Sequence, residues 1–107
     1  MATPLLDAHR TLVATTIIQQ LGGRRFMAMT GTRRFLVTGD GIQFRIGRGA
    51  QHGITLVTIA LTPADTYRVR FYRTRGVTST LVEELTDVYC DGLRAAFTRV
   101  TGFDTRL

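Results

Sequence analysis

The stretch Gly53–Glu84, GITLVTIALTPADTYRVRFYRTRGVTSTLVEE, is a run of β-forming residues broken at two turn signals, Thr62–Asp65 and Arg75–Gly76. It predicts three consecutive antiparallel strands. The middle strand, residues 66–73, alternates apolar side chains with arginines. A period of two indicates one face against a core and the other in water. The stretch therefore predicts a half-buried sheet whose outer face carries guanidinium groups.

Shorter segments before this stretch add further strands. Residues 25–29 and 34–38 are predicted as strands joined by a turn at 30–33, and Asp40-Gly41 suits the next tight turn. Residues 42–46 alternate strictly and place Arg45 outward. The glycine-rich segment 47–53 is expected to be a flexible surface loop, and phosphate cradling is the alternative.

Helical patterns lie at the two ends of the chain. The first helix is expected at residues 4–21, with Thr3 as its N-cap, Leu6 on its apolar stripe and Gly22-Gly23 ending it. A capping-box match at Thr80–Glu83 could start a second helix, but the β-branched residues there favour a strand.

The second helix is therefore placed later, at about 86–101, with Thr86 as its N-cap and Gly102 as its stop. Asp87 and Asp91 then complement the helix dipole, and Cys90 is expected to pack as a small hydrophobe. Its predicted buried face comprises Val88, Tyr89, Leu93, Ala96, Phe97 and Val100.

Segregated strands between terminal helices predict an α+β fold. We expect one domain over residues 1–107, with an antiparallel sheet of about five to six strands and the helices packed on one face. The other face of the sheet would be open to solvent.

Charge is unevenly distributed along the chain. The net charge is +6, and all fourteen basic residues are arginine. Residues 23–82 hold ten of these arginines against two aspartates, a local excess of +8. Such asymmetry favours contact with a polyanion over general solubilisation.

The sequence lacks the residue patterns that several classes of function require. His9, His52 and Cys90 match no zinc spacing, and segment 47–53 lacks the lysine and hydroxyl pair of a nucleotide-binding loop. We therefore expect no metal, no cofactor and no enzymatic activity, a small enzyme being the least favoured reading. The apolar runs fall short of the roughly 20 residues of a membrane span. With a single cysteine and no secretory pattern, a cytoplasmic location in a host cell is expected.

The segment Leu21–Phe35, LGGRRFMAMTGTRRF, resembles a signature of small uncharacterised proteins from bacteriophages and mobile elements. Val88-Tyr89 followed by Asp91, and Thr101-Gly102, agree with the same pattern. The chain departs from it at Arg24, Thr32 and Arg33, where asparagine, lysine or alanine is expected. The resemblance implies a phage or prophage origin, and it implies no catalytic residue.

Two functional hypotheses follow from the arginine-rich face. In the first, a non-enzymatic phage-type accessory protein contacts DNA or RNA, with arginines on phosphates and a tyrosine stacking on bases. The candidate residues for this contact are Arg45, Arg48, Arg68, Arg70, Tyr72 and Arg73. In the alternative, an interaction module binds a host or phage protein or self-associates through the sheet. A merely solubilising role for the arginines stays open as well.

Overall fold

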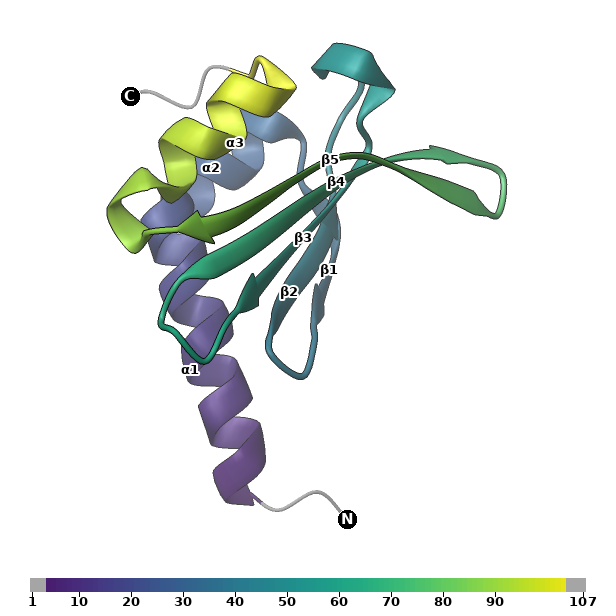
Figure 1. Ribbon diagram of the computed structural model, residues 1–107. Coiled ribbons are helices and arrows are strands. Elements are labelled where there is room, and N and C mark those ends of the chain that lie inside the picture. Colours follow the sequence, from purple (N-terminus) through teal and green to yellow (C-terminus); the bar gives the residue numbers. More distant parts are fainter. Residues whose placement is uncertain (1–3, 104–107) are drawn as a thin grey trace.

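A computed structural model describes the backbone of residues 4–103 and the side chains of residues 11–103. Two helices precede the sheet and a third follows it (Figure 1). The helices are α1 (Pro4–Leu21), α2 (Gly23–Thr30) and α3 (Leu93–Thr101), with short 3-10 turns η1 (Gln51–Gly53) and η2 (Cys90–Gly92). The strands are β1 (Arg33–Val37), β2 (Gly41–Arg45), β3 (Leu56–Leu61), β4 (Tyr67–Arg75) and β5 (Thr78–Val88).

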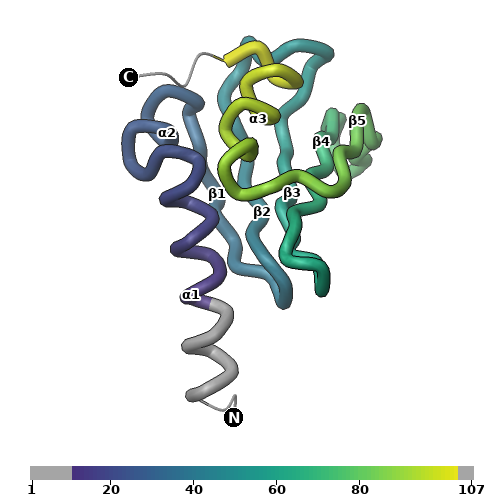
Figure 2. Tube along the Cα trace, turned by 60° about the vertical axis from the view of Figure 1, so that its left-hand side comes forward, coloured from purple at the N-terminus to yellow at the C-terminus, as the bar shows by residue number. Residues whose placement is uncertain are grey.

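The five strands form one antiparallel sheet in the order β1-β2-β3-β4-β5, so every strand pairs with its neighbour in sequence. The three helices lie on the same side of this sheet (Figures 1 and 2). We call that side the inner face and the opposite side the outer face. The predicted α+β class, the antiparallel sheet and the terminal helices are confirmed.

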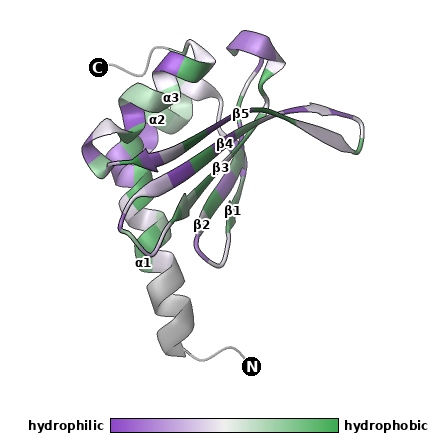
Figure 3. Ribbon diagram, viewed as in Figure 1, coloured by the Kyte–Doolittle hydropathy of each residue, from purple (hydrophilic) through white to green (hydrophobic). Residues whose placement is uncertain are grey.

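Aromatic side chains fill the core between the sheet and the helices. Phe44 on β2 and Phe71 on β4 are buried, and each ring centroid lies 6.3 Å from that of Phe97 on α3. Phe26 on α2 meets Phe97 edge-on at 4.8 Å. From α1, Ala14, Ile17 and Leu21 complete the core. Thr3 and the side chain of Leu6 lie outside the described residues. Figure 3 shows hydrophobic and hydrophilic residues alternating along β4.

The strand predicted at residues 25–29 is wrong, because this segment is helix α2. Phe26 and Thr30, four residues apart, are the buried positions, and the Thr30 hydroxyl donates a hydrogen bond to the Phe26 carbonyl. Spacing of four residues puts both side chains on one helix face. Gly22 and Gly31 flank the helix with positive φ angles of 127° and 65°, which favour glycine. Met29 is exposed.

The second helix begins later than predicted, at Leu93. β5 continues to Val88 because its backbone pairs with β4 as far as Tyr67, and Leu85 and Val88 pack against the core. Asp87 sits at a strand irregularity with a φ of 56° and not at a helix start.

The predictions for the residues between β5 and α3 are also wrong in part. Cys90 is exposed in η2 and is not packed as a hydrophobe, and Asp91 lies in the same turn. Tyr89 is 66% exposed and does not belong to the buried face, whereas Leu93, Phe97 and Val100 do. Gly102 ends α3 in the left-handed conformation, as expected. No helix within residues 4–103 combines the length and hydropathy needed to cross a membrane.

Candidate functional site

The outer face of the sheet carries the arginines that the alternation of β4 predicted. Strand register places Arg68 beside Ala60 and Arg70 beside Thr58 of β3. Tyr72 follows on the same side, paired with Leu56 of β3 and Leu81 of β5. Since no helix covers this side, these side chains are available to a ligand (Figure 1).

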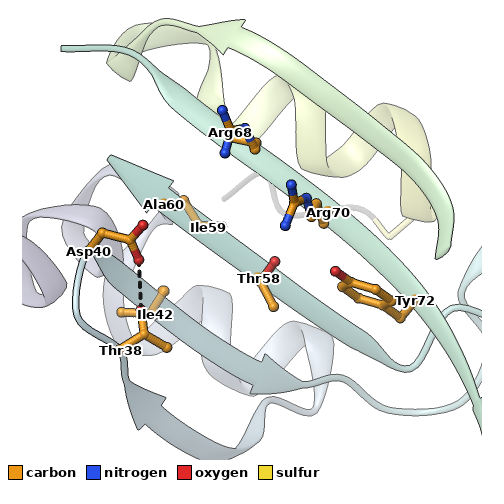
Figure 4. Close-up of a pocket in the computed structure, with 9 residues that line it drawn as sticks. All are labelled: Thr38, Asp40, Ile42, Thr58, Ile59, Ala60, Arg68, Arg70 and Tyr72. Atoms are coloured by element: carbon orange, nitrogen blue, oxygen red, sulfur yellow. Dashed lines mark hydrogen bonds between the residues drawn. The ribbon is translucent and has the colours of Figure 1, made fainter. Parts of the chain in front are cut away.

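A first depression of about 220 Å³ lies on this face. Figure 4 shows Arg68, Arg70 and Tyr72 in a row along β4, with Thr58 on β3 and Asp40 at the β1–β2 hairpin across from them. The Thr38 hydroxyl donates a hydrogen bond of 3.4 Å to the Asp40 carboxylate. The lining therefore mixes two guanidinium groups with one carboxylate, which weakens the attraction for an anion.

A second carboxylate reduces the charge of the first depression further. The Arg70 Nε donates a hydrogen bond to Glu84 Oε2 on the neighbouring strand β5. This hydrogen bond, together with the negative charge of Glu84, raises the pKa of Arg70. Arg70 is thus already paired, whereas Arg68, the other arginine of β4 in this depression, has no ion-pair partner among the side chains of residues 11–103.

A second depression, of about 250 Å³, lies elsewhere on the outer side of the sheet and has a different lining. Arg33 from β1, Arg45 from β2 and Arg48 from the loop after β2 line it, with Thr55, Thr74, Ile46 and Gly76. We call Arg33, Arg45 and Arg48 the arginine cluster. No carboxylate lines this depression, and within residues 11–103 none of the three arginines forms an ion pair.

The β1–β2 hairpin creates the arginine cluster. Arg33 and Arg45 are direct cross-strand partners. The register shifts between Arg33 and Leu36, where Arg34 has a φ of 52°. Strict alternation from Leu36, which lies on the outer side, would place Arg33 on the inner side. One extra residue in β1 reverses this and brings Arg33 to the outer side.

A close backbone contact positions the third arginine. The Gly47 N–H donates a 2.8 Å hydrogen bond to the Thr30 carbonyl, which ties the loop to the end of α2. A Cβ on Gly31 would lie only 3.2 Å from the Gly47 Cα. This approach requires glycine at Gly31, where φ is also 65°. Arg48 follows directly and joins the depression.

The six predicted site residues do not form one group. Arg45 and Arg48 belong to the arginine cluster, whereas Arg68, Arg70 and Tyr72 line the first depression. Arg73 lies on the opposite side of β4, where its Cδ would be 3.2 Å from a Cβ on Gly53. A period of two followed strictly from Arg68 places Arg73 there, so its inclusion with the outer face is wrong.

Sequence reasoning missed Arg33, which it assigned to a turn. Only the bulge in β1 brings Arg33 to the outer side, and no residue pattern marks this bulge. Within residues 11–103, no three His, Cys, Asp or Glu side chains are gathered closely enough to hold a metal ion. The comparisons of the chain with protein-family models, with curated proteins and with solved structures find no match.

Proposed function

We propose that this protein binds nucleic acid through the outer side of its sheet, and that the arginine cluster contacts the phosphate backbone. One observation carries the proposal: Arg33, Arg45 and Arg48 converge from separate segments on a depression that no carboxylate of residues 11–103 lines. Three positive charges held together repel one another unless an anion lies between them.

The chemistry of the lining suits phosphate. A guanidinium group presents a planar fork of donors that matches phosphate oxygens in a bidentate manner. Thr55 and Thr74 add hydroxyl groups at the same depression. Contacts of this kind position a nucleic-acid backbone without reading its sequence. Along β4, Arg68 and Tyr72 extend the contact with one further charge and one ring for base stacking.

We also propose that the protein is a non-enzymatic accessory protein, and the resemblance of Leu21–Phe35 implies a phage or mobile-element origin for it. No catalytic step is assigned to it. Its action would consist of occupying or organising a nucleic-acid strand, which requires backbone contacts and no general acid or base.

A second candidate function is supported by apolar residues on the outer face. Leu36 on β1 is 55% exposed and Leu81 on β5 is 49% exposed. Both are placed on the outer side by their pairing with Gln43 and Tyr72. Exposed apolar side chains beside arginine and tyrosine are typical of protein interfaces. A protein partner, or a second copy of this chain, would bury these leucines together with Tyr72.

The proposed function is tested by salt-dependent binding to labelled single-stranded and double-stranded oligonucleotides. The cluster variant Arg33→Gln/Arg45→Gln/Arg48→Gln is compared with Arg24→Gln/Arg25→Gln/Arg94→Gln, which removes equal charge from exposed positions on the helices. Each lost phosphate contact should make the plot of log K against log salt shallower by about 0.7 to 0.9. The cluster variant should lose about three such contacts.

Three results would separate the candidates. A shallower slope in the cluster variant alone supports nucleic-acid binding at the arginine cluster. Equal losses in both triple variants would contradict a defined site, because only net charge would matter. An absence of wild-type binding at low salt, combined with a dimeric mass that Leu81→Ser abolishes, would favour self-association.

A further inference from the structure

The hairpin formed by β4 and β5 extends beyond the rest of the sheet. The last β4 residue paired with β3 is Tyr72, whereas pairing between β4 and β5 continues to Arg75 and Thr78. We call residues 73–80 the arm. Figure 1 shows it projecting away from the helices and from the other strands. At its base, the Thr74 N–H donates a 3.3 Å hydrogen bond to the Thr55 hydroxyl, which braces the arm against the body.

The composition of the arm favours a polyanionic partner. Arg73 and Arg75 are exposed, and no aspartate or glutamate occurs between residues 66 and 82. Arg73 and Arg75 share one side of β4 by alternation, while Thr74 lies on the other side opposite Ser79. The hydroxyl oxygens of Thr74 and Ser79 lie 3.5 Å apart. Arginine and hydroxyl donors on two sides of a ribbon can contact the two phosphate backbones that flank a groove.

The tip of the arm is apolar. Val77 is fully exposed and contributes nothing to the core. Gly76 precedes it with a φ of 58°, and a cross-strand pair between Arg75 and Thr78 leaves a two-residue loop. Glycine at the first loop position permits a tight hairpin turn that matches strand twist. Only two residues make the tip, so Val77 stands at the end of a narrow ribbon.

The arm also borders the arginine cluster. Thr74 and Gly76 line the same depression as Arg33, Arg45 and Arg48. A ligand held by the cluster is therefore in reach of the arm. Because the two are adjacent, one nucleic acid can contact the arginine cluster through its phosphate backbone and the arm through its bases.

We propose that the arm enters the major groove of double-stranded DNA tip first, while the arginine cluster holds an adjacent phosphate backbone. This inference rests on the proposed function and names its ligand. Val77 then contacts base edges, where the thymine methyl group is the apolar feature of the major groove. Arg73 and Arg75 contact phosphates beside the groove.

Dimensions select this groove. The arm extends three residues past β3, or about 10 Å at roughly 3.4 Å per residue. The major groove of B-DNA is about 8.5 Å deep and about 12 Å wide, and it admits a two-stranded ribbon. The DNA minor groove is only about 6 Å wide. The major groove of duplex RNA is deep and too narrow for side chains to read. Duplex DNA is thus the nucleic acid that accepts the arm without deformation.

The experiment uses the full chain and three ligands of equal length: duplex DNA, single-stranded DNA and duplex RNA. The arm variant Arg73→Gln/Arg75→Gln is compared with Arg24→Gln/Arg25→Gln, which removes the same charge from α2. The arm variant should bind duplex DNA more weakly, and its plot of log K against log salt should be shallower by about 1.8. Its affinity for single-stranded DNA should fall less. Melting curves establish that each variant is folded.

A second variant tests the tip itself. Wild-type protein and Val77→Ser are titrated with duplex DNA containing either thymine or uracil, which lacks the methyl group. The wild type should favour the thymine duplex about fourfold for each methyl contacted, and Val77→Ser should not discriminate. Because Val77 is fully exposed, the substitution leaves the fold intact.

Each outcome bears on one of the two proposals. Preference for duplex RNA or single strands, or equal affinity of the arm variant and wild type for duplex DNA, overturns the arm proposal. Equal wild-type affinity for the two duplexes excludes the thymine contact and overturns it as well. These results leave the arginine cluster as a nucleic-acid site. In these titrations, a failure of the wild type to bind any of the ligands defeats the proposed function itself.

Discussion

Arg33 and Arg45 lie directly opposite each other on adjacent strands, so that two positive charges face each other in one ladder. Like charges in this arrangement destabilise a sheet. Both arginines line the depression that also holds Arg48, and none of the three has an ion-pair partner within residues 11–103. A binding site for an anion accounts for this unfavourable pair, since function and stability are often opposed at such positions.

Arg45→Thr should therefore stabilise the protein while weakening its binding to nucleic acid. The expected gain is roughly 0.2 to 1 kcal/mol, because threonine suits a strand and the repulsion disappears. Urea denaturation measures the free energy of unfolding, and an oligonucleotide titration measures binding. Added inorganic phosphate should raise the melting temperature of the wild type more than that of the variant. A less stable variant would show that Arg45 contributes through packing of its aliphatic stem.

Glu84→Gln should increase nucleic-acid affinity, because it releases the guanidinium group of Arg70 from its hydrogen-bonded carboxylate. The salt slope should steepen by up to about 1, the contribution of one new phosphate contact. The double variant Arg70→Gln/Glu84→Gln removes a neutral pair and should bind like the wild type. If the double variant instead loses as much affinity as Arg68→Gln does, then Arg70 contacts the ligand despite Glu84.

Phe97→Ala should destabilise the fold by about 3 to 5 kcal/mol, the usual cost of removing a buried aromatic ring. Phe97 is buried and its ring meets those of Phe26, Phe44 and Phe71. Arg94→Ala, at an exposed position of the same helix, should change stability by less than about 0.5 kcal/mol. Chemical denaturation of both variants compares them. Similar small effects would mean that α3 does not pack on the sheet as described.

Alkaline pH should destabilise the protein through Tyr67. Burial raises the pKa of Tyr67 above its ordinary value of 10.0, with a smaller contribution from Cys90, against a hydrogen bond to Gln20 that lowers it. The neutral phenol is thus favoured in the folded state, and the unfolded chain loses its proton at lower pH. Its contribution is complete below pH 10.0 and is lost as pH rises through the folded pKa.

Tyr67→Phe removes this titration. Unfolding free energies of both proteins, measured from about pH 8 to about pH 11, should converge as the pH rises, because only the wild type carries the linked proton. Parallel curves would show that Tyr67 has the same pKa in both states and that other groups set the alkaline limit.

The strand pattern of the middle of the chain was predictable from local chemistry. The alternation in residues 66–73 correctly placed Val69 and Phe71 in the core and Arg68 and Arg70 outside, because successive side chains of a strand point to opposite faces. Turn glycines and the helix stop at Gly102 were predictable for a similar reason. A positive φ angle is a property of a single residue and its immediate neighbours.

Helix α2 and the late start of α3 depended on partners distant in sequence. Phe26 is helical because its ring meets Phe44 and Phe97, and β5 runs on to Val88 because β4 offers it a ladder. Short segments with mixed patterns suit either structure, and tertiary packing decides between them.

The candidate site divides in the same way. The sequence by itself determined that an excess of arginine lies in the strand-rich middle and that Arg68 and Arg70 share a face. Only the tertiary structure paired Arg70 with Glu84, turned Arg33 toward Arg45 through a bulge, and carried the arm past the end of β3. Charge content and side-chain alternation are local properties of the chain. Strand register and bulges depend on pairing between distant segments, and one extra residue in a strand reverses which side chains share a face.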